Sequence, residues 1–222
     1  NADDLDILVR SGAVDRERAT LLPGSGVDVD RFRPTPLPTG TPVKLLFAGR
    51  LIEQKGIRLL VEAVRQLREA GHDIELHVVG FVDEGNPTAL SQADVDCWNA
   101  DGDIEFHGAT DSIEEAIARV HCVVHPSYYR EGRPRILMEA AACGRPVITT
   151  NSVGCRDAVR PGETGLLCEP NDVESLSSAI RDFVAAGAEV HHTMSQAARR
   201  LAEREFDEQI VLNRYRAALG LG

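Results

Sequence analysis

Short apolar runs rich in β-branched residues alternate along this chain with segments of helical periodicity, about six times over. The expected strands are 43–49, 74–80, 103–106, 121–125, 147–150 and a short one within 162–168, with a brief extra one at 19–22. Alternation of this kind, without internal repeats, is typical of a parallel sheet covered by helices. The sequence therefore predicts an α/β fold: a Rossmann-like parallel sheet of about six strands with helices on both faces.

The segments outside this alternation predict the domain boundaries. A short helix is expected at Asp4–Ser11, and four prolines between residues 33 and 42 predict a linker. Residues 111–114 are expected to form a capping box that opens a helix, and Asp172 is expected to cap a helix that runs through Phe183. Two further helices are expected near residues 193–203 and 207–219. We therefore expect one domain, 19–222, preceded by a separate segment, 1–18.

Charge and composition exclude several classes of function. The formal net charge is −11, which argues against a nucleic-acid partner, because nucleic-acid phosphates attract basic surfaces. It also argues against a main contact with an anionic membrane, and no apolar run approaches the ~18 residues of a transmembrane segment. The five cysteines include no C-x-x-C pair, which indicates small buried residues in a reducing compartment. These features favour a cytoplasmic protein.

Two glutamates, Glu131 and Glu139, frame the start of a predicted helix. Pro134 suits the first turn of that helix, and Glu139 can lean back toward the preceding loop because helical side chains point toward the N-terminus. Gly132 leaves room for a ligand, and the helix start offers free N–H groups and a partial positive charge. These features suit a ligand with hydroxyls and phosphates, such as a nucleotide-sugar. The alternative is a solvated acidic pair beside an ordinary surface helix.

Two basic residues, Arg50 and Lys55, flank the turn that follows the strand 43–49. Open α/β sheets bind ligands at the carboxyl ends of their strands, so both side chains are candidates for an anionic ligand. The alternative is that both are ordinary surface charges. The fingerprint G-x-G-x-x-G is absent from this turn, which excludes a nicotinamide-dependent dehydrogenase.

Three motifs carry a resemblance to a known family. They are E-G-x-P with E-A-x-A-x-G-x-P-V around the two glutamates, G-R-L-x-x-x-K-G around Arg50 and Lys55, and G-x-G-V-D after Pro23. In these motifs the chain resembles the retaining nucleotide-sugar glycosyltransferases of family four, which have the two-domain GT-B fold and an E-x7-E motif. The resemblance covers essentially the whole chain, but only the C-terminal half of such an enzyme.

The resemblance implies roles for individual residues. Arg50 and Lys55 would bind the donor diphosphate, Glu131 the donor sugar and Glu139 the ribose, with Arg50, Lys55 and Glu131 serving the reaction. Base contacts are expected near His107 to Ala109. The complete set implied for the donor site is Gly24, Gly26, Arg50, Lys55, Gly80, Gly108, Glu131, Gly132, Arg133, Pro134 and Glu139.

The resemblance also implies a reaction without a metal ion or other cofactor. Asp28-Val29-Asp30 has the D-x-D spacing that holds a divalent ion in other glycosyltransferases, but we expect Asp28 to brace its turn instead. The histidines show no metal-ligand spacing, and we assign His107 no catalytic role. Two loops depart from the commoner family pattern, residues 81–88 and 152–157, which affects their expected contacts with the donor and not the fold.

The function implied is donor binding within a larger enzyme. Residues 1–18 would be a remnant of an N-terminal acceptor domain and the crossing from it, and 19–222 the donor-binding domain. The whole enzyme would transfer a sugar from a UDP- or GDP-linked donor to an acceptor hydroxyl with retention, in cell-surface polysaccharide synthesis. It would be cytoplasmic, with any membrane association through the acceptor domain, and this chain alone would be inactive. The alternatives are a non-catalytic nucleotide-sugar-binding module, or an epimerase or phosphorylase of similar fold.

Overall fold

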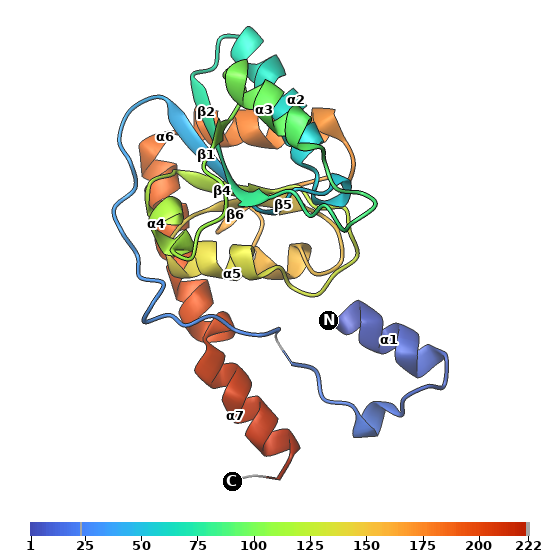
Figure 1. Ribbon diagram of the computed structural model, residues 1–222. Coiled ribbons are helices and arrows are strands. Elements are labelled where there is room, and N and C mark those ends of the chain that lie inside the picture. Colours follow the sequence, from blue (N-terminus) through green and yellow to red (C-terminus); the bar gives the residue numbers. More distant parts are fainter. Residues whose placement is uncertain (23, 221–222) are drawn as a thin grey trace.

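The computed structural model describes residues 1–22 and 24–220. Its centre is a six-stranded parallel sheet with the order β3-β2-β1-β4-β5-β6 (Figure 1). The strands are β1 Val43–Arg50, β2 Ile74–Phe81, β3 Glu105–Phe106, β4 Cys122–His125, β5 Val147–Thr150 and β6 Gly165–Cys168. Strand order reverses between β1 and β4, which is the position where open α/β sheets form ligand crevices. The predicted fold class is confirmed.

Helices cover both faces of the sheet. They are α1 Ala2–Arg10, α2 Ile57–Glu69, α3 Gln92–Ala100, α4 Ile113–Ala118, α5 Arg135–Ala142, α6 Val173–Leu201 and α7 Glu208–Ala218. Alternate residues of β1 point to opposite faces, as a strand requires: Leu45 and Phe47 pack with α2, α3 and the first part of α6, whereas Leu46 packs with α4 and α5. The two hydrophobic cores are therefore separated by the sheet itself.

Three expectations for individual elements were wrong. Residues 19–22 form no strand; a single 3-10 turn, Arg16–Arg18, precedes them. The helix capped by Asp172 does not end at Phe183 but runs to a break at Gly187, where φ is 77°, and a second helix follows to Leu201, as expected. A capping box expected at residues 111–114 does not form, because Glu114 instead binds the Arg31 guanidinium at 3.0 Å.

Arg145 fixes the linker and two helices to one another. Its side chain is fully buried, and its guanidinium donates to the carbonyls of Thr35 and Pro36 in the linker. It also donates to carbonyls at the C-terminal ends of α4 and α5. Burial lowers the pKa of Arg145 to about 10, so the side chain remains charged at neutral pH and complements these helix ends.

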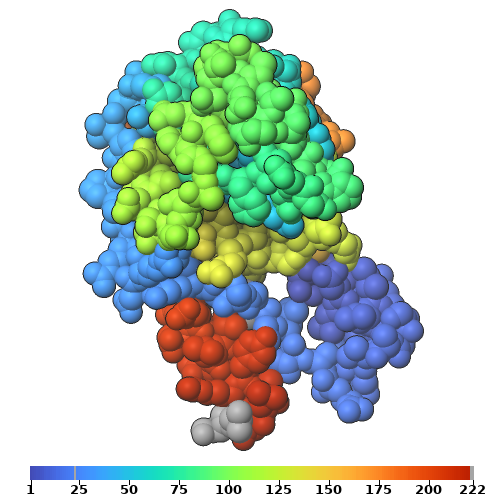
Figure 2. All heavy atoms as spheres, in the orientation of Figure 1, coloured from blue at the N-terminus to red at the C-terminus, as the bar shows by residue number. Residues whose placement is uncertain are grey.

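The chain enters and leaves the sheet domain at neighbouring points. The Val27 N–H donates to the Phe206 carbonyl at 2.8 Å, and the Glu208 N–H donates to the Val27 carbonyl at 3.1 Å. In the view of Figure 2, α1 and α7 both project from the same end of the molecule. Among the described residues, no helix combines the length and the apolar character that crossing a membrane would require.

Candidate functional site

A cavity of about 540 Å³ lies at the carboxyl ends of the central strands. It is lined by residues that end β1 and β2, by the loop after β4 and by the first turns of α5. Arg50, Lys55, Glu131 and Glu139 all border it, although they come from distant parts of the sequence. The geometry therefore brings together the two basic and two acidic side chains on which the sequence prediction rests.

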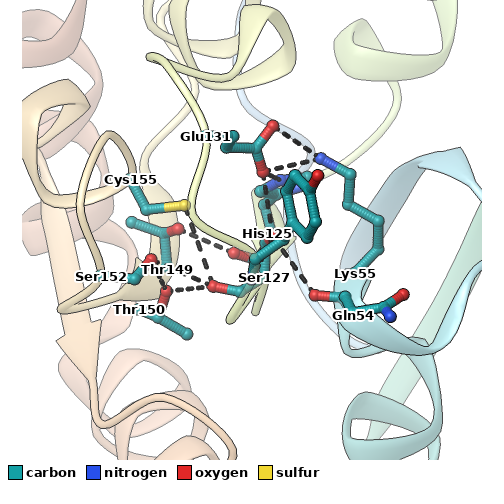
Figure 3. Close-up of polar contacts among 10 residues, drawn as sticks. Gln54, Lys55, His125, Ser127, Glu131, Thr149, Thr150, Ser152 and Cys155 are labelled. Carbon is teal, nitrogen blue, oxygen red and sulfur yellow. Dashed lines mark hydrogen bonds and ion pairs between the residues drawn. The ribbon is translucent and has the colours of Figure 1, made fainter. Parts of the chain in front are cut away.

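Lys55 and Glu131 form the closest polar contact in the cavity (Figure 3). Lys55 Nζ lies 2.7 and 2.8 Å from the two carboxylate oxygens of Glu131, and the Ser127 hydroxyl donates to the same carboxylate at 2.9 Å. Burial by itself would raise the pKa of Glu131, but contacts with His125 and Lys55 outweigh it and lower that pKa to about 2. Glu131 is therefore a fixed anion across the physiological range.

His125 closes the floor of this cluster. It is the last residue of β4, its side chain is 2% exposed, and its Nε2 lies 3.6 Å from a Glu131 oxygen. Burial lowers the pKa of His125, which keeps the imidazole neutral at neutral pH despite the adjacent carboxylate. The positive charge next to Glu131 therefore comes from Lys55.

Glu139 has a different environment. It lies in the second turn of α5 with a side chain that is 12% exposed, and its nearest cation is Arg135 at 3.5 Å. Burial raises the pKa of Glu139, with Arg135 opposing the shift. A carboxylate that borders a cavity, and whose charge a nearby arginine only partly neutralises, is a strong hydrogen-bond acceptor for ligand hydroxyls.

The start of α5 supplies donors of the opposite kind. Pro134 occupies the N-cap position rather than the expected first turn, and the helix begins at Arg135. Pro134, Arg135 and Ile136 line the cavity, and the first N–H groups of a helix precede its hydrogen-bond ladder. This helix end can accept an anion.

Two glycines shape the side of the cavity formed by β1 and β2. Gly49 and Gly80 are register partners, and a Cβ on Gly80 would lie 1.9 Å from the Gly49 carbonyl oxygen. Arg50 follows Gly49 and forms a 3.1 Å ion pair with Asp83. The strands thus approach closely where the basic side chain leaves the sheet.

Several residues implied for the donor site lie elsewhere. Gly24, Gly132 and Arg133 line a second cavity of about 370 Å³ beside α1, and the Arg133 guanidinium lies 4.7 Å from the Phe206 ring centroid. Gly26 packs against the backbone of Glu208. The Gly108 carbonyl accepts from the Gly80 N–H at 2.8 Å, and its neighbours Ala109 and Thr110 border the first cavity. The geometry does not bring Gly24, Gly26, Gly132 or Arg133 to the cavity that holds Arg50.

Asp28 braces its turn, as expected. Its carboxylate accepts from the N–H groups of Asp30 and Arg31, both at 2.9 Å. Another possible metal cluster, His125, Glu131 and Cys155, has its ligating atoms within 4.8 Å. Lys55 neutralises Glu131 there, and burial raises the pKa of the Cys155 thiol, so this cluster is a poor cation site.

Sequence reasoning missed His125, Ser127, Arg135 and Gly154. His125 ends a predicted strand, and its position at the carboxyl edge of the sheet was the available signal. Gly154 lies in the loop 152–157, for which donor contacts were expected, but its contact with the Glu131 loop was not: a Cβ there would lie 2.3 Å from the Glu131 carbonyl oxygen and 2.5 Å from that of Gly132. The loop that departs from the common family pattern therefore supports the Glu131 loop directly.

A doubly covered parallel sheet with a charged cavity at its carboxyl edge defines the class of open α/β domains that bind ligands at the ends of their strands. Within that class, residues 28–201 match the family glycosyl transferases group 1, and the chain belongs to it. It corresponds to the C-terminal-like domain of the GT-B fold.

Relatives of known description agree with this assignment. The chain is 29% identical over 199 residues to WcaL of Escherichia coli, named for colanic acid biosynthesis, covering 87% of this chain and 49% of WcaL. It is 30% identical over 183 residues to glycogen synthase of Mycobacterium tuberculosis, covering 78% of this chain and 41% of the synthase. The chain thus spans about half the length of the curated relatives it matches.

Solved structures share the fold. Sucrose-phosphate synthase of Thermosynechococcus elongatus gives a TM-score of 0.74 at 28% identity, covering 89% of this chain and 52% of the synthase. Anabaena HepE in complex with UDP also gives 0.74, at 19% identity, covering 88% of this chain and 56% of HepE. The C-terminal domain of LpcC from Francisella tularensis gives 0.65 at 21% identity and is covered over 99% of its length, against 82% of this chain.

Proposed function

We propose that this chain is the donor-binding half of a retaining glycosyltransferase. The whole enzyme would transfer a sugar from a nucleotide-diphosphate sugar to an acceptor hydroxyl. The observation that carries the proposal is the meeting of Arg50, Lys55, Glu131 and Glu139 on one cavity. Such a cavity offers cations for a diphosphate and carboxylates for sugar hydroxyls on one lining.

Each group has a defined part in the proposed reaction. The leaving nucleoside diphosphate gains negative charge as the glycosidic bond breaks, and Arg50, Lys55 and the start of α5 would stabilise that charge. Glu139 would accept hydrogen bonds from ribose hydroxyls, and Glu131 from hydroxyls of the sugar. Because cationic side chains supply this stabilisation, we propose transfer without a metal ion or other cofactor.

Glu131 is not proposed as a nucleophile. Its carboxylate already binds Lys55 and Ser127, and a pKa near 2 describes a weakly basic, fully paired anion. Retention would then arise by attack of the acceptor on the same face from which the diphosphate leaves. Lys55 has three N–H donors, so it can keep its contact with Glu131 while it also reaches a phosphate oxygen.

The partner and pathway follow from the same proposal. The chain would work with an N-terminal acceptor-binding domain, of which residues 1–18 would be a part. Exposed apolar side chains on α1, on α7 and just after α7 offer a surface for it: Ile7, Leu8, Leu212, Tyr215 and Leu219. Relatives named for capsular polysaccharide and lipopolysaccharide core biosynthesis favour a role in surface polysaccharides. We propose a UDP- or GDP-linked donor and a cytoplasmic site of action.

Substitution of Glu139 tests the binding role. Hydrogen bonds to a charged group contribute about 1.5–3 kcal/mol, and about 1.4 kcal/mol corresponds to tenfold in affinity. Glu139→Gln is therefore expected to weaken nucleotide binding by roughly 10- to 150-fold. Calorimetric titration with UDP, GDP and ADP measures this and identifies the base.

Glu62→Gln, an exposed change on α2, is the matched control and should bind like the parent chain. An unchanged affinity of Glu139→Gln for every nucleotide that binds the parent would remove Glu139 from the site. Product analysis with the full-length protein separates a transferase from an epimerase, a phosphorylase or a non-catalytic binding module. Formation of a free epimer or a sugar phosphate, or no product with any acceptor, would favour these alternatives.

A further inference from the structure

A third cavity, also lined by polar side chains, lies between the β2–β3 edge of the sheet and α4, with a volume of about 390 Å³. Its lining includes two imidazoles and a carboxylate, those of His77, His107 and Glu105. The proposed transfer reaction gives these three side chains no role.

The sheet register brings the three residues together. His77 on β2 is the register partner of Glu105 on β3, and His107 lies two residues beyond Glu105, on the same face of the sheet. His77 Nδ1 lies 3.1 Å from His107 Nε2 and 3.4 Å from a Glu105 oxygen. His107 Nε2 lies 3.7 Å from the other Glu105 oxygen.

These separations match the ligand atoms of a small metal ion. Zinc–nitrogen bonds are about 2.0–2.1 Å long, and tetrahedral ligand atoms are about 1.6 bond lengths, or about 3.4 Å, apart. The three measured separations surround that value. Two imidazoles and a carboxylate are also ligand types that Zn²⁺ accepts.

We propose that His77, Glu105 and His107 form a binding site for a divalent transition-metal ion of the Zn²⁺ class. Three protein ligands leave a fourth position that faces the cavity. The site would be additional to the donor cavity and would take no part in sugar transfer.

A neighbouring carboxylate prepares His77 for this role. Glu75 Oε2 lies 3.4 Å from His77 Nε2 without a hydrogen bond between them, and its charge favours the tautomer that leaves Nδ1 able to bind a metal. Lys44 Nζ in turn lies 3.2 Å from Glu75.

Metal binding would stabilise the weakest edge of the sheet. β3 has only two residues, and the site would join it to β2. Three residues, Val79, Ala109 and Thr110, line both this cavity and the donor cavity. A metal ion here would therefore order the turn after β3, which borders both cavities.

Titration with ZnCl₂ tests the site without any nucleotide, so its outcome is independent of the proposed transfer reaction. Cys97 is exposed and lies 3.4 Å from Asp101, so Cys97→Ser provides the background chain. We expect one Zn²⁺ per chain, and His107→Ala to weaken binding more than about 100-fold, since loss of an outer partner alone costs about 10- to 100-fold. Glu75→Gln should lie within that smaller range.

His192→Ala, an exposed histidine on α6, is the matched control and should retain the parent affinity. Circular dichroism of each variant excludes misfolding, and His107 and Glu105 are exposed enough for substitution. Co²⁺ in place of Zn²⁺ should give the visible absorption of a four-coordinate site, absent in Glu105→Ala. Equal Zn²⁺ affinity in the parent, His107→Ala and Glu105→Ala would overturn the proposal and leave a hydrogen-bonded imidazole pair.

Discussion

Glu131 and Glu139 border one cavity, yet their surroundings shift their pKa values in opposite directions. Lys55 and His125 lower the pKa of Glu131, whereas burial raises that of Glu139. Environment, not residue type, therefore separates a carboxylate that is already paired from one that still has acceptor capacity. In the proposed reaction this difference matches a fixed role for Glu131 and a ligand-dependent role for Glu139.

Removal of the Lys55 charge should leave the Glu131 carboxylate without its cation and so lower the stability of the fold. The two side chains are 11% and 19% exposed, and loss of one member of such a pair leaves an unpaired charge. Lys55→Met, which keeps the aliphatic stem, is expected to lower the free energy of unfolding by about 2–4 kcal/mol at pH 7. Urea unfolding measures it, with Lys44→Met as control, because the exposed Lys44–Glu75 pair contributes below about 1 kcal/mol.

The same pair predicts a pH dependence. The pKa of Glu131 is lowered on folding from 4.5 to about 2, so its stabilisation is complete above pH 4.5 and is lost as the pH falls toward 2. Lys55→Met should therefore lose less stability than the parent over this interval. Parallel stability curves of the two chains between pH 5 and pH 2, within the range where both still fold, would contradict the assignment.

At the scale of elements, one buried arginine connects parts that the sheet does not. Arg145 joins the linker before β1 to the ends of α4 and α5 through its guanidinium donors. These carbonyls lie where helices leave acceptors without intrahelical partners. Arg145 therefore satisfies several orphan groups at once and holds α5 against the sheet.

Arg145→Lys tests this role because it keeps the positive charge but removes the planar guanidinium, whose N–H groups point in several directions. A lysine has three donors on one atom and cannot reach carbonyls on opposite sides. We expect a loss of about 2–4 kcal/mol in the free energy of unfolding, since buried carbonyls lose their donors. Arg119→Lys, on an exposed side chain at the end of α4, should change it by less than about 0.5 kcal/mol. A loss no larger in Arg145→Lys than in Arg119→Lys would contradict this account.

Most helices and strands and the main charged groups of the site could be predicted from local sequence patterns, whereas contacts between distant segments could not. Alternation of strand and helix patterns predicted the sheet, and strand ends predicted the neighbourhood of Arg50, Lys55 and Glu131. Among elements, the strand expected at residues 19–22 did not form, and the position of the break at Gly187 between two helices was not predicted. His77 and His107 are thirty positions apart and meet only through strand register, so their spacing gave no metal signal.

At the scale of the whole molecule, the residues described for the proposed site all belong to one domain, on one side of the position that an acceptor would occupy. Its cavity opens from the edge of a single domain, and the chain is about half as long as its curated relatives. An acceptor must be held opposite this edge for transfer, which requires groups on a facing surface. The proposed acceptor-binding domain would supply them.

This arrangement predicts binding without turnover. The 222-residue chain should bind UDP or GDP. Its free energy of unfolding should rise by about 2.7 kcal/mol when the nucleotide is at one hundred times its Kd, and its melting temperature should rise with it. It should transfer no sugar to an acceptor, because in the proposed enzyme the acceptor-binding domain would contribute that half of the site. Thermal shift and chromatographic product assays on the same preparation check both statements. Transfer by this chain alone would show that the acceptor contacts lie within it.

Two backbone hydrogen bonds join Val27 to the residues around Asp207. The segments that lead to α1 and α7 therefore leave the sheet domain side by side. Helix α1 is also tied to this domain by the Asp4–Arg130 and Asp3–Arg156 ion pairs, whose arginines lie in two loops beside Glu131. A displacement of α1 would therefore act on these two loops. A movement of α1 would thereby affect the position of Glu131 through ion pairs at the surface.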